Sequence, residues 1–257
     1  MSPALDLPPL IGHRGAAAEA PENTLASFRR AAEAGARWVE FDVKLSADGV
    51  PIVIHDARLD RTTSGRGLVR ACPFAAIRKL DAGSWFDRRF AGERVPSLDE
   101  AVALCLDLGL GINVELKPCP GLAETTARAA IDTLTRHGAP RDGRVLISSF
   151  EPRCLAIAQA LAPALPRGHL CGFVPRDWPA ALARYGCTTL HANQLRISRR
   201  RLAALRAAGA RILLYTVNDP GRARQLLADG ATAVFTDRVT DLARALQAPA
   251  VAPSPAQ

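Results

Sequence analysis

The sequence has little of several features that would mark a membrane, secreted or nucleic-acid-binding protein. No stretch approaches the roughly 18 consecutive apolar residues of a membrane-spanning helix. Residues 1–10 contain three prolines and neither a basic start nor an unbroken apolar run, so we expect no signal peptide. Aromatic residues make up only 5% of the chain, too few for the stacking surfaces of nucleic-acid-binding proteins.

Paired cysteine motifs are also missing. The six cysteines form no Cys-x-x-Cys pair and no zinc-binding spacing. Several lie in apolar stretches, as Cys105 does, where a free thiol behaves as a small hydrophobe. This usage predicts reduced thiols and a cytoplasmic location. A glycine-rich phosphate loop is absent too, so Gly12 and Gly15 are expected in turns.

Basic residues exceed acidic ones by 33 to 25, which gives a formal net charge of +8. They are dispersed along the chain, and residues 199–201 are the single run of arginines. We therefore expect a solvated basic surface that attracts small anionic substrates. We expect neither nucleic-acid binding nor stable membrane association.

The 257 residues alternate between strand and helix patterns from end to end. The candidate strands cover residues 10–14, 38–45, 111–117, 145–150, 169–174, 188–192, 211–217 and 232–236. The helical stretches that follow them cover residues 24–34, 97–107, 122–136, 152–161, 178–185, 199–208, 220–227 and 239–246. Eight such units in a chain of this length predict an α/β fold, a (β/α)8 TIM barrel.

The predicted domain organisation is simple. One catalytic domain covers residues 1–248, and residues 249–257, rich in Pro, Ala and Ser, form a disordered tail. An insertion of about residues 46–96 follows the second strand and begins with a hairpin turn at Asp48-Gly49. Asn23 either caps the helix that begins at Thr24 or belongs to the site.

Acidic side chains alternate with apolar ones in two candidate strands. Glu40 and Asp42 share one face of the second strand, and Glu115 and Lys117 share one face of the third. Three carboxylates that converge at a barrel mouth repel one another strongly. A hard divalent cation such as Mg2+ or Ca2+ would relieve that repulsion, although pairing with Arg14 and Lys117 alone is the structural alternative.

Two histidines flank these acids along the chain. His13 ends the first strand, and His55 ends the apolar run 51–54 of the insertion. Imidazoles beside a metal suit general acid and general base roles, whereas a lone strand-end histidine is more often structural. Arg14 offers a planar fork for a phosphate. Together these groups predict hydrolysis of a phosphate ester.

The same residues carry a resemblance to a known family. The chain resembles the glycerophosphodiester phosphodiesterases, and in particular their short cytoplasmic bacterial form. The motifs that carry it appear in order along nearly the whole chain: His13-Arg14-Gly15, Pro21-Glu22-Asn23-Thr24, Glu40-Phe41-Asp42-Val43, His55-Asp56, Leu59-x-Arg61-Thr62-Thr63, Glu115-Leu116-Lys117, Ser148-Ser149-Phe150, Tyr215-Thr216-Val217-Asn218 and Thr236-Asp237.

The resemblance implies a metal-dependent enzyme of lipid and glycerol metabolism. It would cleave glycerophosphocholine, glycerophosphoethanolamine and similar diesters to sn-glycerol 3-phosphate and an alcohol. By position, Glu40, Asp42 and Glu115 would hold the metal and His13 and His55 would be the acid–base pair, in an order the sequence leaves open. Arg14 and Lys117 would bind phosphate oxygens. Tyr215 would face the glycerol, although family members often carry Trp there.

Other interpretations stay open from the sequence. A lysophospholipid-cleaving, phospholipase D-like enzyme on the same fold would use aromatic residues of the insertion, namely Phe74, Trp85, Phe86 and Phe90. A non-catalytic ligand-binding barrel is disfavoured because every expected acid–base residue is present. Asp56 and Arg61 are expected to form a pair that orients His55, and His191 is expected to be structural. The protein is expected to be a monomer or a homodimer.

Overall fold

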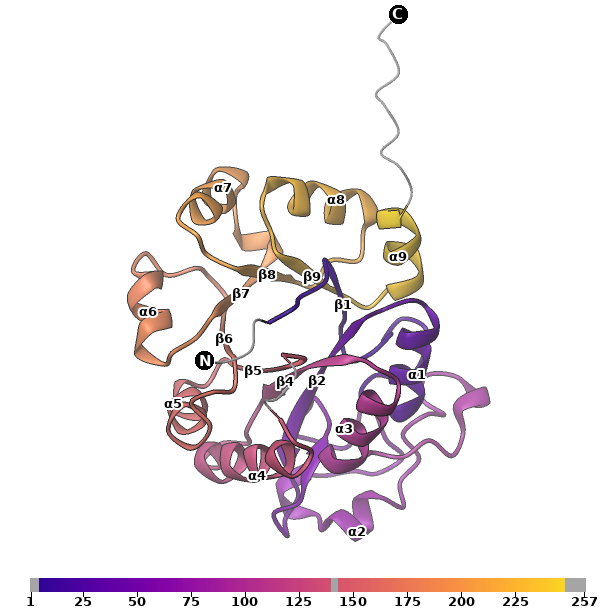
Figure 1. The fold of residues 1–257 in the computed structure, drawn as a ribbon. Coiled ribbons are helices and arrows are strands. Elements are labelled where there is room, and N and C mark those ends of the chain that lie inside the picture. The colour runs from indigo at the N-terminus through magenta and orange to yellow at the C-terminus, as the bar shows by residue number, and fades with distance from the viewer. Residues whose placement is uncertain (1–4, 140–142, 248–257) are drawn as a thin grey trace, which may run out of the picture.

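A computed structural model describes residues 5–139 and 143–247 of the chain. Within these residues, eight parallel strands close into a barrel, and helices surround it (Figure 1). The predicted TIM barrel is therefore confirmed. The expected disordered tail, residues 249–257, lies outside the described residues.

The strands follow one another around the barrel almost in chain order. They are β1 Leu10–Gly12, β2 Trp38–Leu45, β4 Gly111–Leu116, β5 Val145–Ser149, β6 Arg167–Cys171, β7 Thr189–Asn193, β8 Ile212–Tyr215 and β9 Ala233–Thr236. Each pairs with its neighbour in parallel, and β1 pairs with both β2 and β9. This double pairing of β1 closes the barrel.

Each helix on the outside follows a barrel strand, and the insertion separates β2 from the helix that comes after it. They are α1 Leu25–Glu33, α3 Leu98–Asp107, α4 Ala123–Arg136, α5 Pro152–Leu161, α6 Trp178–Arg184, α7 Arg199–Ala207, α8 Pro220–Asp229 and α9 Val239–Gln247. Their starts carry good caps. Ser97 and Glu100 form a full capping box at α3, in which each side chain bonds the other residue's backbone N–H.

Most strand boundaries differ from the sequence expectation by one to three residues, and two of the differences have a clear local cause. The first strand ends at Gly12 rather than residue 14, because Arg14 and Gly15 adopt positive φ angles of 50° and 85°. β6 begins at Arg167, two residues before the expected start at residue 169. Arg167 is buried there because its guanidinium donates to backbone carbonyls, including that of Leu165 at 2.7 Å.

Three apolar clusters stabilise the fold. The largest lies between the strands and the outer helices and includes the outward-facing Val39, Phe41 and Val43 of β2. A second cluster fills the barrel interior. It contains Leu5, from the N-terminal segment, and the strand residues Ile11, Trp38, Leu146, Leu213, Ala233 and Phe235. The alternation in β2 thus separates an apolar outer face from an inner face that carries the acids, as predicted.

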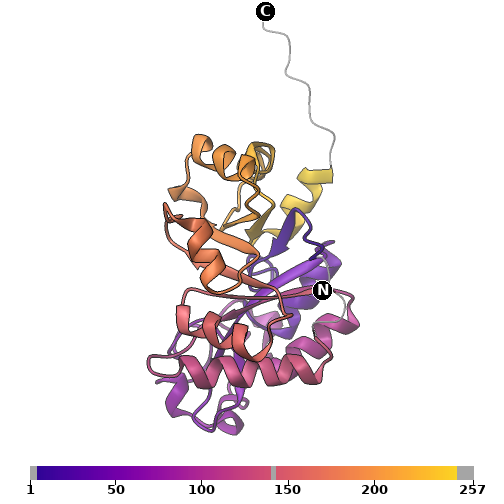
Figure 2. The same ribbon diagram turned by 60° about the vertical axis from the view of Figure 1, so that its left-hand side comes forward.

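The insertion has the third cluster as its own small core. It contains β3 Pro51–Val53, the 3-10 turns η1 Val69–Ala71 and η2 Arg88–Phe90, and the short helix α2 Phe74–Ile77. β3 pairs antiparallel to β2 through the predicted hairpin. Ile52, Leu59 and Ile77 are fully buried in this cluster. Figure 2 shows the insertion, in purple, at the end of the molecule away from α7 and α8.

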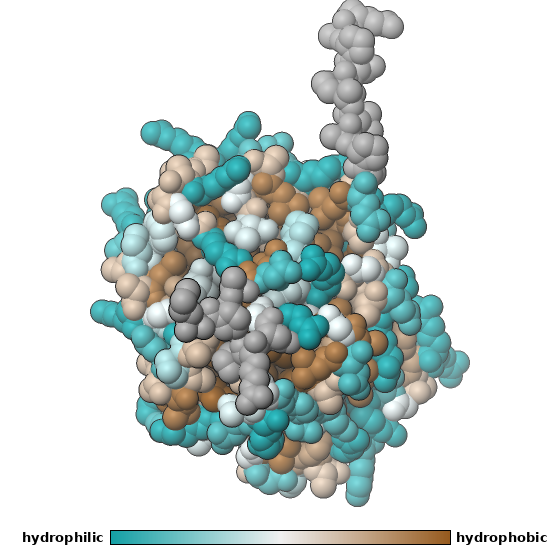
Figure 3. Space-filling model, viewed as in Figure 1, coloured by the Kyte–Doolittle hydropathy of each residue, from teal (hydrophilic) through white to brown (hydrophobic). Residues whose placement is uncertain are grey.

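The surface agrees with the expected polar exterior on the face that Figure 3 shows. Hydrophilic side chains stand around its outline, and apolar surface appears as separate patches between them (Figure 3). Among the described residues, no helix combines the length and the apolar character that crossing a membrane requires.

Candidate active site

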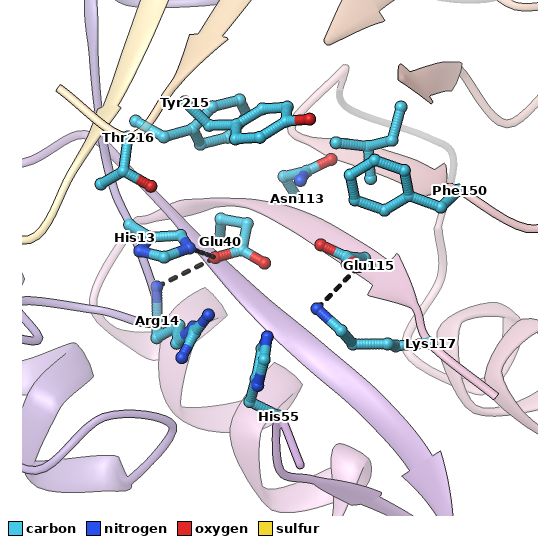
Figure 4. A pocket seen from close by; sticks show the side chains of 12 residues that line it. His13, Arg14, Glu40, His55, Asn113, Glu115, Lys117, Phe150, Tyr215 and Thr216 are labelled. Atoms are coloured by element: carbon cyan, nitrogen blue, oxygen red, sulfur yellow. Dashed lines mark hydrogen bonds and ion pairs between the residues drawn. The ribbon is translucent and has the colours of Figure 1, made fainter. Parts of the chain in front are cut away.

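A cavity of about 200 Å³ opens at the carboxyl ends of the barrel strands (Figure 4). This is below the roughly 300–1,000 Å³ typical of drug-sized ligand pockets, so it suits a small ligand. Charged and polar side chains form one side, and apolar ones form the other. The lining residues are His13, Arg14, Glu40, His55, Asn113, Glu115, Lys117, Phe150, Leu170, Tyr215, Thr216 and Phe235.

Three carboxylates converge beside this cavity. Glu40, Asp42 and Glu115 are buried, and one oxygen atom from each lies within 4.8 Å of the others. Asp42 and Glu115 are direct partners in the β2–β4 register, which places the two strands' acids side by side. The predicted convergence is confirmed for the positions of these groups.

Neighbouring cations compensate the negative charge of Asp42 more fully than the charges of Glu40 and Glu115. Burial and the neighbouring Asp42 raise the pKa of Glu40 to about 8. Burial and Asp42 likewise raise the pKa of Glu115. Burial opposes ionisation of Asp42 too, but Lys117 at 3.0 Å and Arg14 at 3.4 Å outweigh it and hold the pKa of Asp42 below its ordinary value.

The site fits a divalent cation by the chemistry of its donors. Oxygen Oε1 of Glu40 is buried without a hydrogen-bond partner, and so is Oδ1 of Asn113. Within the described part of the chain, neither Lys nor Arg pairs with Glu40. Pairing with Arg14 and Lys117 side chains therefore leaves Glu40 with only His13, at 4.0 Å, as a cationic neighbour, which disfavours the purely structural interpretation. Hard cations prefer such oxygen ligands.

His13 is held by a carboxylate from the far end of the chain. Its Nδ1 lies 2.7 Å from Oδ1 of Asp237, and its Nε2 lies 4.0 Å from Oε2 of Glu40. Burial lowers the pKa of His13, but the hydrogen bond to Asp237 and the charge of Glu40 outweigh it and raise this pKa above its ordinary value. Asn218 in turn donates to Asp237 at 2.7 Å.

The turn after β1 requires Gly15. At its φ of 85°, a side chain would be strained, and a Cβ atom would collide with Ser27 of α1. This close approach lets the backbone N–H of Arg14 donate to Oε2 of Glu40 at 2.9 Å. Gly15 is thus the turn glycine that the sequence predicts, and it places Arg14 beside the acids.

His55 has a carboxylate partner within the insertion. Its Nδ1 lies 2.7 Å from Asp56, and Arg61 donates to Asp56 at 2.8 and 3.0 Å. The expected Asp56–Arg61 pair is therefore present. Burial lowers the pKa of His55, and the cations Arg14 and Lys117 lower it further against the opposing charge of Asp42.

Glu22 joins the two halves of this charge network. It accepts two hydrogen bonds from Arg61 and one from Arg14, each 2.8 Å long. The residues Arg14, Glu22, Arg61, Asp56 and His55 thus form one continuous chain of contacts from the β1 turn to the insertion. Glu22 lies in the motif Pro21-Glu22-Asn23-Thr24, but the sequence alone predicts no such bridging role for it.

Of the two interpretations that the sequence leaves open for Asn23, the helix cap is wrong. Thr24 is the N-cap, and its side chain accepts from the N–H of Ser27. Asn23 has a positive φ of 58°, which turns its side chain toward the barrel. There it donates to Asp42 at 2.9 Å and accepts from the Asp42 backbone N–H at 3.2 Å. It therefore orients an acid of the cluster.

Aromatic rings form the apolar side of the cavity. Phe150 and Tyr215 meet edge to face with ring centroids 5.9 Å apart (Figure 4). The Tyr215 hydroxyl donates to the carbonyl of Cys171 at 2.8 Å, and burial raises its pKa to about 12. Tyr215 also packs against the interior cluster, so it serves both core and wall. A cis peptide bond joins it to Thr216.

The sequence points to some of the lining residues beyond the predicted site residues. Asn113 shares a strand face with Glu115 and Lys117, and Phe150 and Thr216 lie within motifs of the family resemblance. Leu170 and Phe235 carry no local signal, since each comes from a different strand. Of the other histidines, His191 is fully buried beside Thr189 and burial lowers its pKa to about 3, which agrees with the structural role expected for it.

The fold and the cavity together define a class of protein. The barrel is closed and parallel, and its mouth brings together three acids, two histidines that contact carboxylates, and two cations suited to phosphate. This arrangement is typical of a TIM-barrel hydrolase that acts on phosphate esters. Residues 13–241 match the model of the Glycerophosphoryl diester phosphodiesterase family. The chain belongs to this family.

Similar proteins agree with this assignment over nearly the full chain. The sequence is 36% identical over 234 residues to the glycerophosphodiester phosphodiesterase of Caldanaerobacter subterraneus subsp. tengcongensis, covering 89% of this chain and 93% of that protein. The structure of an Oleispira antarctica phosphodiesterase in complex with the product sn-glycerol-3-phosphate matches with a TM-score of 0.91 and 40% identity, over 94% of this chain and 98% of that one. The glycerophosphodiester phosphodiesterase structure from Agrobacterium tumefaciens matches with a TM-score of 0.78 and 32% identity, over 93% and 100%.

Proposed function

We propose that this protein hydrolyses glycerophosphodiesters, such as glycerophosphocholine and glycerophosphoethanolamine, to sn-glycerol 3-phosphate and an alcohol. The observation that carries the proposal is the acid cluster with its unpartnered Glu40 oxygen, set beside His13 and His55 in one small cavity. Family membership and the product-bound Oleispira antarctica relative support the choice of substrate.

The roles of the residues follow from their positions. Arg14 and Lys117 bind the phosphate oxygens, and Tyr215 with Phe150 faces the organic part of the substrate. Water attacks phosphorus and the bond to the leaving oxygen breaks. One histidine takes the proton of the water, and the other gives a proton to the departing alkoxide.

Glu40, Asp42 and Glu115 would hold a divalent cation, for which Mg2+ and Ca2+ are the candidates. Such an ion would polarise the phosphoryl group and neutralise charge that develops on its oxygens. Asn23 and Lys117 keep Asp42 ionised and oriented for this purpose, because both contact its carboxylate.

A preference for lysophospholipids lacks the feature expected to support it. Within the described residues, none of the insertion aromatics Phe74, Trp85, Phe86 and Phe90 lines the cavity. Instead, the ring of Phe86 meets those of Trp85 and Phe90 edge to face, each at a centroid distance of 5.7 Å. We further propose a cytoplasmic location, which the free thiols of the six cysteines support.

The test is release of sn-glycerol 3-phosphate from glycerophosphocholine and glycerophosphoethanolamine. We expect EDTA to abolish turnover and added Mg2+ or Ca2+ to restore it. Glu40→Gln and His13→Ala should each lower kcat by on the order of 10² to 10⁴-fold. Glu33→Gln, which changes an exposed carboxylate of α1, is the matched control. Undiminished turnover in EDTA would remove the cation from the mechanism.

A further inference from the structure

An arginine that the proposed reaction does not use lies at the same end of the barrel as the cavity, outside the residues that line it. Arg196 belongs to the 3-10 turn η3 Gln194–Arg196, which directly follows β7. Its guanidinium lies over the ring of Phe173, 4.4 Å from the ring centroid. Phe173 stands two residues beyond the end of β6, and the strand carries the cavity residue Leu170. The pair therefore lies at the same barrel end as the cavity.

Further contacts place Arg196 next to the aromatic wall. A Cβ atom added at Gly172 would lie 3.4 Å from an Nη atom of Arg196, and Gly172 adjoins Cys171, whose carbonyl accepts the Tyr215 hydroxyl. In the sheet register, Asn193 at the base of η3 is the partner of Tyr215. The positive charge of Arg196 also opposes the burial that raises the pKa of Tyr215.

The turn that carries Arg196 is anchored in place. Asn193 caps it by accepting from the N–H of Leu195 at 2.9 Å. Arg222 of α8 donates to the Gln194 side chain at 3.1 Å and to its carbonyl at 3.2 Å. These hydrogen bonds hold the first two residues of η3, so the backbone that leads into Arg196 is anchored to β7 and α8.

No described acidic residue neutralises the charge of Arg196. Among the described residues, no carboxylate lies within ion-pair distance of its guanidinium. Its neighbours Phe173 and Leu195 are exposed to 66% and 82%, which is unusual for large apolar side chains. An unpaired cation beside exposed apolar surface is suited to an organic ligand that carries an anionic group.

We propose that Arg196, with Phe173, forms a second anion subsite that selects substrates with an additional carboxylate or phosphate on an organic substituent. The scissile phosphate is bound at Arg14 and Lys117, and the substituent that lies along the Phe150–Tyr215 wall ends near Arg196. Because the guanidinium covers one face of Phe173, a cationic choline group finds a like charge there rather than a free aromatic ring. This inference rests on the proposed function and adds a preference for anionic over cationic substituents.

The experiment compares matched diesters that differ by one anionic group. The first pair is glycerophosphoserine and glycerophosphoethanolamine, which differ by the carboxylate of the leaving alcohol. The second pair is glycerophosphoethanolamine with and without a phosphate on the free terminal hydroxyl of its glycerol. The ratio of kcat/KM within each pair is measured for wild type, Arg196→Gln, Arg196→Lys and Arg200→Gln. Arg200 is an exposed residue of α7, so its substitution removes the same charge away from η3.

We expect the anionic member of at least one pair to be preferred by wild type. Arg196→Gln should reduce that ratio by about two- to fivefold, which corresponds to an exposed ion pair. Arg196→Lys should restore part of it, and Arg200→Gln should leave it unchanged. The pair that responds shows whether the anion lies on the alcohol or on the glycerol. Equal ratios in wild type and Arg196→Gln for both pairs would overturn the subsite.

Equilibrium binding separates this inference from the proposed function. Calorimetry on EDTA-treated protein measures Kd for the same diesters without turnover. If wild type hydrolyses none of them yet binds the anionic members more tightly in an Arg196-dependent way, the proposed function fails and the subsite stands. If hydrolysis proceeds but neither kcat/KM nor Kd ratios depend on Arg196, the subsite fails alone.

Discussion

Each of the two site histidines contacts a carboxylate through Nδ1. His13 has Asp237 at 2.7 Å and His55 has Asp56 at 2.7 Å. Such a bond fixes the tautomer and the ring orientation, and it leaves Nε2 available for proton transfer. Asp237 directly follows β9 and Asp56 lies in the insertion, so different elements position the two rings. Asp237 is the better residue for testing this orientation. Its second partner, Asn218, does not line the cavity, so a substitution of Asp237 acts mainly on His13.

We predict that Asp237→Asn lowers kcat by on the order of 10²-fold while KM changes little, because the amide can impose the wrong histidine tautomer. Release of sn-glycerol 3-phosphate measures both constants. Asp241→Asn in α9, which removes an exposed partner of Arg238, is the control and should leave kcat unchanged. A wild-type kcat in Asp237→Asn would show that His13 needs no such orientation.

At the scale of elements, the insertion and the barrel share one ion-pair network. Glu22 follows the β1 turn, Arg61 and Asp56 lie in the insertion, and their contacts are all near 2.8 Å. Arg61 therefore ties the element that carries His55 to the element that carries Arg14. Loss of Glu22 or of Asp56 should weaken the same contact between the insertion and the β1 turn, which runs through Arg61.

We predict that Glu22→Gln and Asp56→Asn are not independent. Each should lower kcat/KM, and the double variant should lose clearly less than the product of the two single losses, because both act through Arg61. Asp60→Asn, in the same loop but paired with Arg58, combined with Glu22→Gln is the control and should show independent effects. Independent losses for Glu22 and Asp56 would contradict the connection.

Within the insertion, one aspartate holds a loop together through backbone hydrogen bonds. Asp81 accepts the N–H groups of Gly92 at 2.6 Å, Ser84 at 2.7 Å and Gly83 at 2.9 Å. The bonds from Gly92 and Ser84 lower the pKa of Asp81 to about 2. Because the folded pKa is depressed, ionised Asp81 adds stability above its ordinary pKa, and this is lost as the pH falls toward 2.

We predict that the free energy of unfolding of wild type exceeds that of Asp81→Asn near neutral pH. The difference should shrink as the pH falls from about 5 to about 2.5, since protonation removes the same charge that the substitution removes. Urea denaturation at several pH values measures it. A difference that stays constant over this range would show that the ionised form contributes nothing.

At the scale of the whole molecule, a net charge of +8 surrounds a site that is proposed to receive anions. The excess of arginine and lysine is spread over the helices rather than gathered in one run. A distributed positive field raises the local concentration of anionic substrates, and salt screens it over about 8 Å at physiological ionic strength. The monomer or homodimer expected from the sequence stays a prediction.

We predict that kcat/KM for a glycerophosphodiester falls by about two- to fivefold between low salt and about 0.3 M NaCl, with the divalent cation kept saturating. The value of kcat at saturating substrate should change little, because screening acts on encounter and binding. Steady-state kinetics at several salt concentrations check this. If kcat/KM does not depend on salt, the overall charge has no part in substrate capture.

The sequence by itself determined those features of the protein that depend on interactions between residues close together in the chain. Strand alternation has a period of two residues, so it placed Glu40, Asp42 and Glu115 on inner faces without any tertiary information. The order of the strand and helix patterns likewise predicted the barrel, because each unit buries its apolar face against the next.

Only the tertiary structure decided which distant groups meet. His13 and Asp237 are 224 positions apart and touch because β1 pairs with β9 when the barrel closes. Asn23 turns toward Asp42 rather than capping α1, since its backbone conformation depends on the packing of the β1 turn. Local periodicity decides the face on which a side chain lies, whereas the closure of the barrel decides its partner there.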